Sequence, residues 1–454
     1  MLQIYNTFTK KKEIFYPLQE KRIFFYVCGV TVYDYCHIGH ARTYLIFDMI
    51  IRFLKWRGYK IYYIRNITDI DDKIIYHAKK NKENIFNLTS RFIKIMNKEF
   101  LDLGMLKPNQ EPRVTENIDH IINMINILLK NRNAYISKNN NIYFRVSSFP
   151  GYGKLSGQNI NELKIDNEIN QDQEKENPLD FAVWKSVSED QCIGWMSPWG
   201  YGRPGWHIEC SVMVNRYLEK KCDIHGGGKD LCFPHHENEI AQFESVYTSK
   251  IANYWMHTGM VRYKNQKMSK SLGNICTIHN IRSKYPSEVI RYFFFLSHYR
   301  KNISYDEKKL LSAKFSLIKL YSALQNMYFP KKIHFQSSYT KQFIDSMNDD
   351  FNTPKAIFIL FKCAKKIKSL KKTNFSLASK YAYELKYLGS ILGILQENPK
   401  KYLKSTKNIL DENIQSLIKK REIARKNKDW KNADKIRNIL SDYGIHIKDK
   451  SILE

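Results

Sequence analysis

The order of apolar runs and polar loops in the first part of the chain predicts a βαβ unit. Residues 23–27 form a short apolar run that ends at Cys28, as a buried strand does. Apolar residues then recur with helical spacing over 41–56, Gly58 follows as a stop signal, and residues 61–64 form a second apolar run. The loop between strand and helix lies at the carboxyl end of the first strand, where open parallel sheets bind ligands.

Downstream, polar and glycine-containing stretches interrupt this pattern. No period is sustained between about residues 112 and 200, although strand-like residues return at 180–184, so we interpret 112–200 as an insertion. Helical spacing then resumes in three segments, which are 208–217, 235–247 and 288–297. The predicted fold class is therefore α/β, with a Rossmann-type parallel-sheet domain over residues 1–300.

The last third of the chain is predicted to be helical. Leu, Ile, Lys and Ser recur with helical spacing, with a break at 352–354, which predicts an α-helical bundle over 301–400. Residues 413–440 predict one long basic helix, and residues 445–447 are strand-like. We therefore expect a small C-terminal domain over 401–454.

Composition narrows the classes of protein that fit. Of the 454 residues 43% are hydrophobic, and the formal net charge is +29, so the chain can bury a large core and is strongly basic. The charge fits a polyanion such as nucleic acid, while the abundance of Lys, Asn, Ile and Tyr also fits AT-rich codon usage, and both explanations stay open. No apolar run approaches the ~20 residues that cross a bilayer, and no apolar signal core is present near the N-terminus, so we expect a cytoplasmic protein. The eight scattered cysteines are expected to be free thiols, apart from a metal site.

Two histidines at the start of the first predicted helix form a candidate phosphate site. His37 and His40 lie three residues apart, so both imidazoles can share one face at a helix N-terminus, whose free N–H groups and partial positive charge favour a triphosphate. Gly39 between them permits close approach of a ligand to the backbone. Taken alone, His-Ile-Gly-His is equally consistent with two surface histidines.

A Lys-Met-Ser-Lys-Ser string far along the chain supplies two further cations. Lys267 and Lys270 can meet the charge that builds on a leaving pyrophosphate, and such stabilisation is worth ~3 kcal/mol per donor. For this string alone, a solvated loop is the alternative. Between the two strings, three glycines at 226–228 allow the backbone to lie against a nucleotide, and Asp230 can accept from a ribose hydroxyl. A glycine turn with a capping aspartate fits these residues equally well.

Acidic residues follow the second predicted strand. Thr68 is positioned to cap the next helix, with Asp69, Asp71 and Asp72 in its first turn, where carboxylates complement the helix dipole. We prefer this solvated arrangement to a metal site.

Cysteine, histidine and glutamate residues suggest a metal site whose membership the spacing leaves open. His235 and Glu239 are four residues apart and so share one helical face. With Cys28 and Cys210 they would provide four ligands of types that zinc accepts. Buried structural cysteines are the alternative, and the spacing leaves further candidate ligands in competition, namely Cys36, Cys222, Cys232, His207 and His236.

The two strings, in this order and at this separation, resemble the signatures of class I aminoacyl-tRNA synthetases, and longer segments resemble the cysteinyl-tRNA synthetase family. These segments are 27–34 (VCGVTVYD), 63–73 (YIRNITDIDDK), 202–211 (GRPGWHIECS), 223–228 (DIHGGG) and 233–239 (FPHHENE). The resemblance covers nearly the whole chain and is most specific over 22–75 and 178–300.

This resemblance implies a ligase that activates L-cysteine with ATP and passes it from cysteinyl-adenylate to tRNA(Cys). It implies one zinc ion per chain, at the floor of the amino-acid pocket, with Cys28, Cys210, His235 and Glu239 as its ligands and the substrate thiolate bound to it. Serine would lose the metal–sulfur bond, so the metal discriminates where an apolar pocket would not. The insertion looks too short for a separate editing domain, which agrees with that mode of selection.

The resemblance also implies roles for individual residues. His37 and His40 would hold the ATP phosphates, which Mg²⁺ accompanies, and Lys267 and Lys270 would stabilise the departing pyrophosphate. Contacts to substrate or nucleotide are implied for Gly29, Thr68, Trp206, Asp230 and Lys270. Three histidines are expected to orient ligands or carry protons, namely His207, His225 and His236.

In the resembling family a helical bundle and a small mixed domain lie over the anticodon. Residues 419–437, with Trp430 among lysines, would meet phosphates and stack a base, although an amphipathic helix that packs Ile423, Trp430, Ile436 and Leu440 also fits. Many family members continue to an aromatic–basic end that is absent after Glu454, which puts part of the anticodon reading in doubt. We expect a monomer.

Two other functions stay open at the level of sequence. A cysteine-activating ligase with an amino-sugar acceptor would lack the C-terminal module, and a non-catalytic RNA-binding paralogue would have damaged signatures. The length and the lysine loop exclude a small nucleotidyltransferase.

Overall fold

A four-stranded parallel sheet forms the centre of the computed structural model. The structure describes residues 1–158, 174–190, 193–218, 221–263, 266–267, 276–329 and 335–442. The strands run in the order β10-β9-β3-β4, all neighbours being parallel, with bounds β3 Arg22–Thr31, β4 Lys60–Thr68, β9 Cys222–Gly228 and β10 Ala252–Thr258. Because β4 and β9 lie on opposite sides of β3, the strand order changes direction there, and the carboxyl ends of β3 and β9 border a crevice that can receive a ligand.

Strand β3 contributes to two separate cores because side chains alternate along a strand. Phe25 and Val27 belong to the core on one face of the sheet, whereas Tyr26 and Cys28 belong to the core on the other. Burial on both faces is what a near-continuous apolar run predicts for a central parallel strand. The alternation places the Cys28 side chain on the second face.

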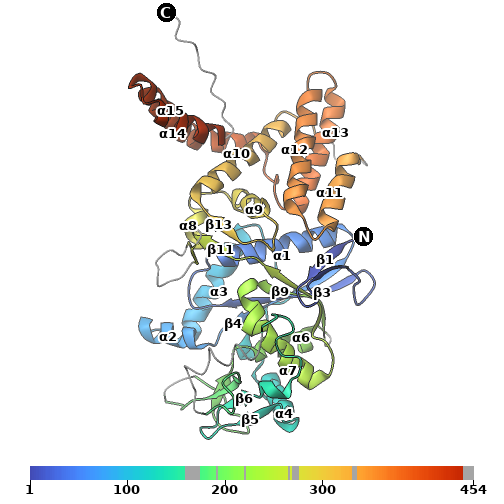
Figure 1. The fold of residues 1–454 in the computed structure, drawn as a ribbon, viewed down its shortest axis with the longest axis vertical. Coiled ribbons are helices and arrows are strands. Elements are labelled where there is room, and N and C mark those ends of the chain that lie inside the picture. The colour runs from blue at the N-terminus through green and yellow to red at the C-terminus, as the bar shows by residue number, and fades with distance from the viewer. Residues whose placement is uncertain are drawn as a thin grey trace, which may run out of the picture.

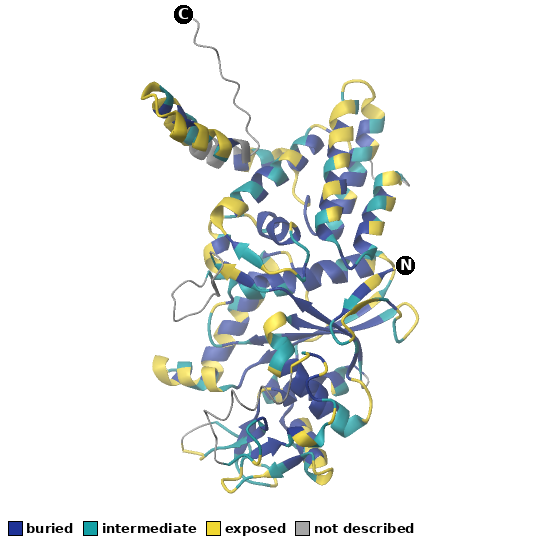
Figure 2. Cartoon of the chain, viewed as in Figure 1, coloured by how far each residue is buried: buried dark blue, intermediate teal, exposed yellow. Residues whose placement is uncertain are grey.

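Helices cover both faces of the sheet (Figure 1). The first face packs against α1 Ile38–Trp56, α3 Ile85–Asp102, α8 Ile278–Arg282 and α9 Ser287–Phe295. The second face packs against α4 Ile118–Lys130, α6 Ile208–Tyr217 and α7 Glu237–Tyr247. Figure 2 shows α1 almost wholly buried between the sheet and the upper part of the molecule. Helix α2 Asp72–Asn81 follows β4, and the α/β fold class is confirmed.

The insertion forms an antiparallel layer of its own. Its four strands run in the order β5-β6-β7-β8, with bounds β5 Ala134–Ile136, β6 Ile142–Phe144, β7 Phe181–Ser186 and β8 Gly202–Pro204. The strand predicted at 180–184 is confirmed as β7. This layer shares the second core with α4 and α6, so it is attached to the face of the sheet that carries Cys28.

Two smaller sheets complete the β-structure. β1 Gln3–Asn6 and β2 Lys11–Ile14 form an antiparallel hairpin at the N-terminus. β11 Val261–Tyr263 pairs in parallel with β13 Ile303–Tyr305 and antiparallel with β12 Gln266–Lys267. Strand β11 directly follows β10 and therefore carries the chain from the parallel sheet to Lys267.

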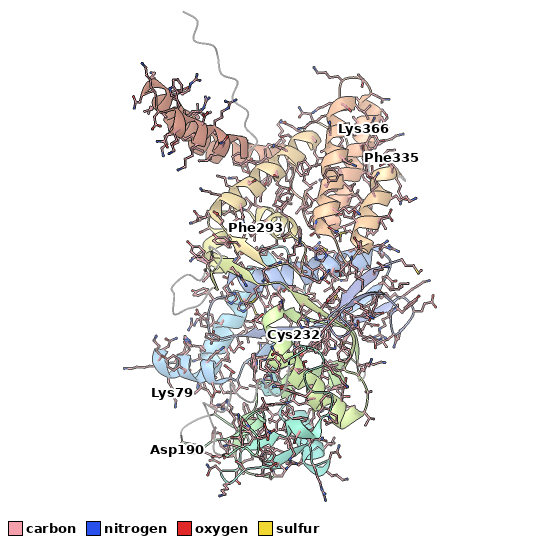
Figure 3. The ribbon with its side chains drawn as sticks, in the orientation of Figure 1. Lys79, Asp190, Cys232, Phe293, Phe335 and Lys366 are labelled. Atoms are coloured by element: carbon pink, nitrogen blue, oxygen red, sulfur yellow. The ribbon has the colours of Figure 1, made fainter. Side chains whose placement is uncertain are left out.

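The C-terminal helices divide into a bundle and a projecting hairpin (Figure 1). The bundle contains α10 Glu307–Leu324, α11 Ser338–Asn348, α12 Thr353–Leu370 and α13 Phe375–Ile391, and the hairpin contains α14 Pro399–Lys426 and α15 Trp430–Asp442. The first core continues from the sheet through residues such as Phe293 of α9, labelled in Figure 3, into the bundle. None of the described helices is both long enough and apolar enough to cross a bilayer.

Three local predictions need correction. Thr68 ends β4 instead of capping a helix, and Asp71 caps α2, with its carboxylate accepting from the Lys73 N–H at 2.9 Å. The three glycines at 226–228 lie inside β9 and not in a turn after it. The single helix predicted at 413–440 is two helices, because Lys428 adopts a left-handed φ of 56° between α14 and α15. The strand predicted at 445–447 lies outside the described residues.

Candidate active site and metal centre

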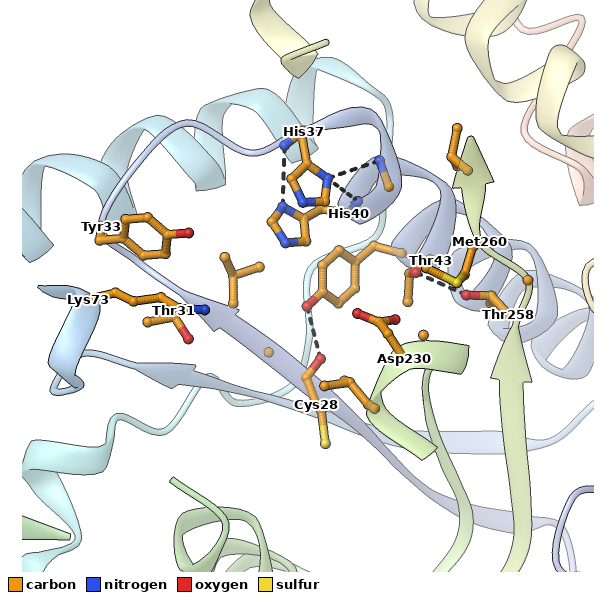
Figure 4. A pocket seen from close by; sticks show the side chains of 18 of the residues that line it. Cys28, Thr31, Tyr33, His37, His40, Thr43, Lys73, Asp230, Thr258 and Met260 are labelled. Carbon is orange, nitrogen blue, oxygen red and sulfur yellow. Dashed lines mark hydrogen bonds between the residues drawn. The ribbon is translucent and has the colours of Figure 1, made fainter. Parts of the chain in front are cut away.

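A pocket of about 370 Å³ lies at the carboxyl ends of β3, β9 and β10 (Figure 4). Its walls include His37 and His40 at the start of α1, Asp230 after β9, and Cys28 with Trp206. The histidine pair and Cys28, a member of the predicted metal-binding set, therefore border the same cavity. An elongated substrate with a phosphate group and a sulfur group would fit such a distribution of side chains.

His37 and His40 cap α1 by a reciprocal pair of hydrogen bonds. Nδ1 of His37 accepts from the backbone N–H of Gly39 at 3.1 Å and of His40 at 3.3 Å, and Nδ1 of His40 accepts from the N–H of His37 at 3.3 Å. The two rings stack with centroids 3.7 Å apart. Since each Nδ1 accepts, each neutral ring carries its proton on Nε2, and both rings lie at a helix N-terminus beside the pocket.

Glycines in this region are required by close packing of the backbone. A Cβ on Gly29 would lie 1.5 Å from the Asn66 carbonyl oxygen, at the point where the register of β3 and β4 shifts. A Cβ on Gly227 would lie 2.7 Å from the His236 ring, so glycine in β9 lets that histidine approach the sheet. Gly29 also lines the pocket, as its predicted role requires.

Asp230 stands at the mouth of the pocket, in the short helical turn η4 Lys229–Leu231 that follows β9. Sequence reasoning missed two neighbouring hydroxyls, those of Thr43 on α1 and Thr258 at the end of β10, whose oxygens are 3.0 Å apart. Both line the pocket (Figure 4). The position of Thr43 one turn after His40 is the signal that would have identified it.

The structure describes only part of the lysine string. Lys267 ends β12, whose pairing with β11 is described, while Lys270 lies outside the described residues. Strand β11 begins at Val261, which lines the pocket, so this strand leads from the pocket towards Lys267.

The two residues expected to contact the amino acid differ in their surroundings. Trp206 lines the pocket with 41% of its surface exposed, and its ring packs on that of His235 at 4.6 Å. Thr68 is buried and is absent from the described lining of the pocket, and its hydroxyl donates to both carboxylate oxygens of Glu209 at 2.8 Å. No pattern in the sequence indicates this buried partner.

Cys28, Cys210, His235 and Glu239 meet behind the pocket, and all four are buried. The Sγ atoms of the two cysteines are 3.7 Å apart, Cys28 Sγ is 3.3 Å from Glu239 Oε1, Cys210 Sγ is 3.5 Å from His235 Nε2, and His235 Nε2 is 2.9 Å from Glu239 Oε1. Zn–S bonds of about 2.3 Å at a tetrahedral angle would separate two sulfurs by about 3.8 Å, so this set fits a small tetrahedral cation.

The competing candidates separate clearly in space. Cys36 and Cys222 are buried elsewhere and belong to no candidate metal group among the described residues, and neither does Cys232. His236 approaches Cys28, its Nε2 lying 3.2 Å from the sulfur, and forms a second possible ligand group with Cys28 and His225. That group offers three donors against four, so the first set is the better cation site.

Three histidines surround the four donors and hold them in place. Nδ1 of His207 is 2.9 Å from Nδ1 of His235, and Nε2 of His225 is 2.7 Å from Oε2 of Glu239. Nδ1 of His236 is 2.8 Å from Nε2 of His257, a residue that sequence reasoning missed. Such outer contacts fix the orientation of metal ligands.

Burial and mutual repulsion disturb the protonation of this cluster. Burial raises the pKa of the Cys28 thiol well above its ordinary value, and the neighbouring Cys210 and Glu239 add to the rise. Burial opposes ionisation of Glu239 as well, but the charges of His225 and His235 prevail and hold its pKa well below the ordinary value. A dication at the centre would favour the thiolate form of both cysteines.

Family models match three successive parts of the chain. The model for the class I (C) tRNA synthetase catalytic domain matches residues 14–315, the DALR domain matches 342–396, and the cysteinyl-tRNA ligase anticodon binding domain matches 408–451. The first match alone covers more than half of the chain.

Curated relatives match over nearly the full length. The cysteine–tRNA ligase of Methylococcus capsulatus is 46% identical over 458 residues, which is 99% of this chain and 98% of the relative. That of Buchnera aphidicola from Acyrthosiphon pisum is 48% identical over 454 residues, covering 99% and 97%.

Solved structures with the same architecture are more distant in sequence. Methionyl-tRNA synthetase from Mycobacterium tuberculosis, in complex with methionyl-adenylate, aligns with a TM-score of 0.57 at 14% identity, over 84% of this chain and 93% of that one. A leucyl-tRNA synthetase from Agrobacterium radiobacter aligns with a TM-score of 0.55 at 10% identity, over 83% and 84%. These likenesses concern the fold, whereas the family models and the curated relatives concern the whole sequence. The chain belongs to the cysteinyl-tRNA synthetase family of class I aminoacyl-tRNA synthetases.

Proposed function

We propose that this chain activates L-cysteine with ATP and transfers the cysteinyl group to tRNA(Cys). One observation carries the proposal: Cys28 lies in the wall of the same pocket that His37 and His40 border, and behind it stand three more candidate ligands. A thiol at one end of a substrate and a triphosphate at the other would be recognised together. Family membership supports the acceptor as well as the amino acid.

Zinc is the metal that we propose for Cys28, Cys210, His235 and Glu239. Two thiolates, one imidazole and one carboxylate are ligands that zinc accepts, and their spacing suits tetrahedral geometry. When bound, zinc would stabilise the thiolate of the substrate and so distinguish cysteine from serine. His207, His225 and His236 would hold the ligands in orientation.

The remaining proposed site residues act on the nucleotide and the amino acid. His37 and His40 would donate from Nε2 to the ATP phosphates, and Asp230 would accept from a ribose hydroxyl. The substrate carboxylate oxygen attacks the α-phosphorus, and the bond from that phosphorus to pyrophosphate breaks. Lys267 and Lys270 would neutralise the departing pyrophosphate, with Mg²⁺ accompanying ATP. Trp206 and Thr68 are proposed to contact the cysteinyl group, and Gly29 is proposed to contact the substrate or the nucleotide.

In the second step a hydroxyl of the terminal ribose of tRNA attacks the carbonyl carbon, and AMP leaves. We propose that residues 1–300 perform both steps, that 301–400 form the intervening bundle, and that 401–454 read the anticodon. In the hairpin Trp430 exposes 58% of its surface, so it is available to stack on a base. Leu440 is buried and Ile436 half-buried, but Ile423 exposes 52% of its surface, so the packing expected of these residues with Trp430 is found only in part.

The first test is ATP–pyrophosphate exchange with each of the twenty amino acids, before and after treatment with a zinc chelator. We expect exchange with cysteine alone, lost on chelation and restored by added Zn²⁺. Charging of tRNA(Cys) by the same preparation then tests the acceptor. Exchange driven by another amino acid, or exchange that survives removal of zinc, would contradict the assignment of the four ligands.

A further inference from the structure

Arg42 is a fully buried cation on α1 without a carboxylate partner among the described residues. Its guanidinium donates to three backbone carbonyls: Nη1 to Met260 at 2.9 Å, and Nη2 to Tyr299 at 3.2 Å and to Lys301. Nε has no hydrogen-bond partner in the described structure. Burial lowers the pKa of Arg42 to about 9, which still leaves it charged at neutral pH. Holding an unpaired charge in a core is costly, so its position calls for an explanation beyond packing.

The three acceptors belong to the two segments that form the base of the β11–β13 pair. Met260 immediately precedes β11 and lines the pocket, and the 299–301 segment precedes β13. These segments are in close contact, since a Cβ on Gly259 would lie 2.3 Å from the Lys301 carbonyl oxygen. Arg42 therefore connects two elements. One is the start of β11, the strand that leads to Lys267, and the other is α1, whose first turn contains His37 and His40.

Beyond the lysine string, the chain is attached beside the same helix by two backbone hydrogen bonds. The Ile38 N–H donates to the Cys276 carbonyl at 2.9 Å, and the Ile278 N–H donates to the Cys36 carbonyl at 2.8 Å. Residues 261 and 276 therefore enter and leave the string at fixed places beside α1. On the entry side the attachment is made by a side chain, and the two terminal nitrogens of its planar guanidinium reach carbonyls of both segments at once.

We infer that Arg42 is a positioning residue that fixes the histidine pair relative to the start of β11, the strand that leads to Lys267. The inference rests on the proposed function, in which the two histidines and Lys267 act on one triphosphate. Misplacement of a catalytic group by about 1 Å costs up to about 100-fold in rate. Cysteine recognition lies across the sheet, in the second core, and does not involve Arg42.

The test is Arg42→Lys, which keeps the charge but offers one nitrogen in place of the two that bind the carbonyls of the two segments. We expect kcat for cysteine-dependent pyrophosphate exchange to fall about 10- to 100-fold, while the KM for cysteine and the zinc content stay within twofold of wild type. Arg291→Lys is the matched control. Arg291 is a second buried arginine whose guanidinium donates to the carbonyls of Leu103 and Leu392, but it also pairs with Asp48. This variant should lose thermal stability and retain kcat.

The outcomes separate the inference from the proposed function. Wild-type protein without cysteine-dependent exchange would refute the proposed function, whereas active wild type with an unchanged kcat in Arg42→Lys would overturn the inference. An equal loss of kcat in Arg291→Lys would also overturn it, since general loosening would then explain both. If Arg42→Lys does not fold, Gly259→Ala separates the same two segments, and an unchanged kcat in that variant counts against the inference.

Discussion

Cys28 and Cys210 come within 3.7 Å of one another although 182 residues separate them in the chain. Each belongs to a different element, β3 and α6, and each is buried by the second core. At this scale the site depends on single atoms, because a tetrahedral cation leaves little freedom in the position of any ligand.

Cys210→Ser should therefore remove most of the bound zinc, because a hydroxyl is a much poorer zinc ligand than a thiolate. Elemental analysis of purified protein measures this directly, and we expect at least a tenfold rise in the KM for cysteine. Cys222→Ser is the control, since Cys222 is equally buried but donates only to the Ile251 carbonyl. Full zinc content in Cys210→Ser would contradict the ligand assignment.

Glu99 gives a second prediction at the scale of one residue. Burial raises the pKa of its carboxyl to about 7, and the backbone N–H groups of His279 and Cys36 oppose this rise in part. The native state thus retains a proton that the unfolded chain releases above its ordinary pKa of about 4.3. Stability from this group is complete below that value and falls as the pH rises towards 7.

Glu99→Gln removes this dependence. We expect the variant to exceed wild type by about 1–2 kcal/mol in free energy of unfolding at pH 8, and by less at pH 5. Thermal midpoints at the two pH values measure the gap, with Glu189→Gln, at an exposed position, as the control. A gap that is the same at both pH values would show that ionisation of Glu99 is not its cause.

At the scale of elements, α1 combines a structural and a chemical role in its first turn. His37 both caps the helix and borders the pocket, so a substitution at this position changes two properties at once. Asparagine is a good N-cap but presents no imidazole N–H, and alanine provides neither.

His37→Asn and His37→Ala together separate the two roles. Loss of the cap in His37→Ala should lower the free energy of unfolding by about 1 kcal/mol, while His37→Asn should change it by only a few tenths. Both should lower kcat for pyrophosphate exchange by about 100-fold, because each loses a donor to the phosphates. Thermal melts measure the effect on stability, and exchange kinetics measure the effect on kcat. A fully active His37→Asn would show that His37 acts only as a helix cap.

At the scale of the whole molecule, the α14–α15 hairpin stands apart from the remainder of the protein. Tyr402, near the start of α14, stacks on Tyr321 of α10 with centroids 3.9 Å apart and is buried, so the first turns of α14 belong to the bundle. Beyond them the hairpin projects from the body (Figure 1). The pocket should therefore not depend on the hairpin.

Truncation after Thr406 tests this independence. We expect cysteine-dependent pyrophosphate exchange within twofold of the full chain, and a loss of at least 100-fold in kcat/KM for tRNA(Cys). Removing the basic hairpin should also flatten the dependence of tRNA binding on salt, because fewer phosphates are neutralised. Equal loss of exchange and charging would mean that the hairpin supports the catalytic fold itself.

Local patterns along the chain predicted most of the elements and the kind of chemistry. Apolar spacing is a local property, so the helix at 208–217 was predicted with the bounds that the structure shows, and the apolar run at 23–27 predicted a buried strand, which is confirmed as part of β3. The shared helical face of His235 and Glu239 is equally local. The break between α14 and α15 could also have been predicted from the sequence, because aspartate is a common helix N-cap. The Asp429 carboxylate caps α15 by accepting from the Asn432 N–H.

Which distant residues meet depends on long-range packing and could not be predicted from local patterns. Spacing alone left Cys36, Cys222 and Cys232 in competition with Cys28 and Cys210, because the approach of two side chains depends on how sheet and helices pack and not on their separation in sequence. The same reason hid Glu209 behind Thr68 and the three carbonyls around Arg42. Local patterns record what each segment can form, and long-range packing selects which of its side chains share a site.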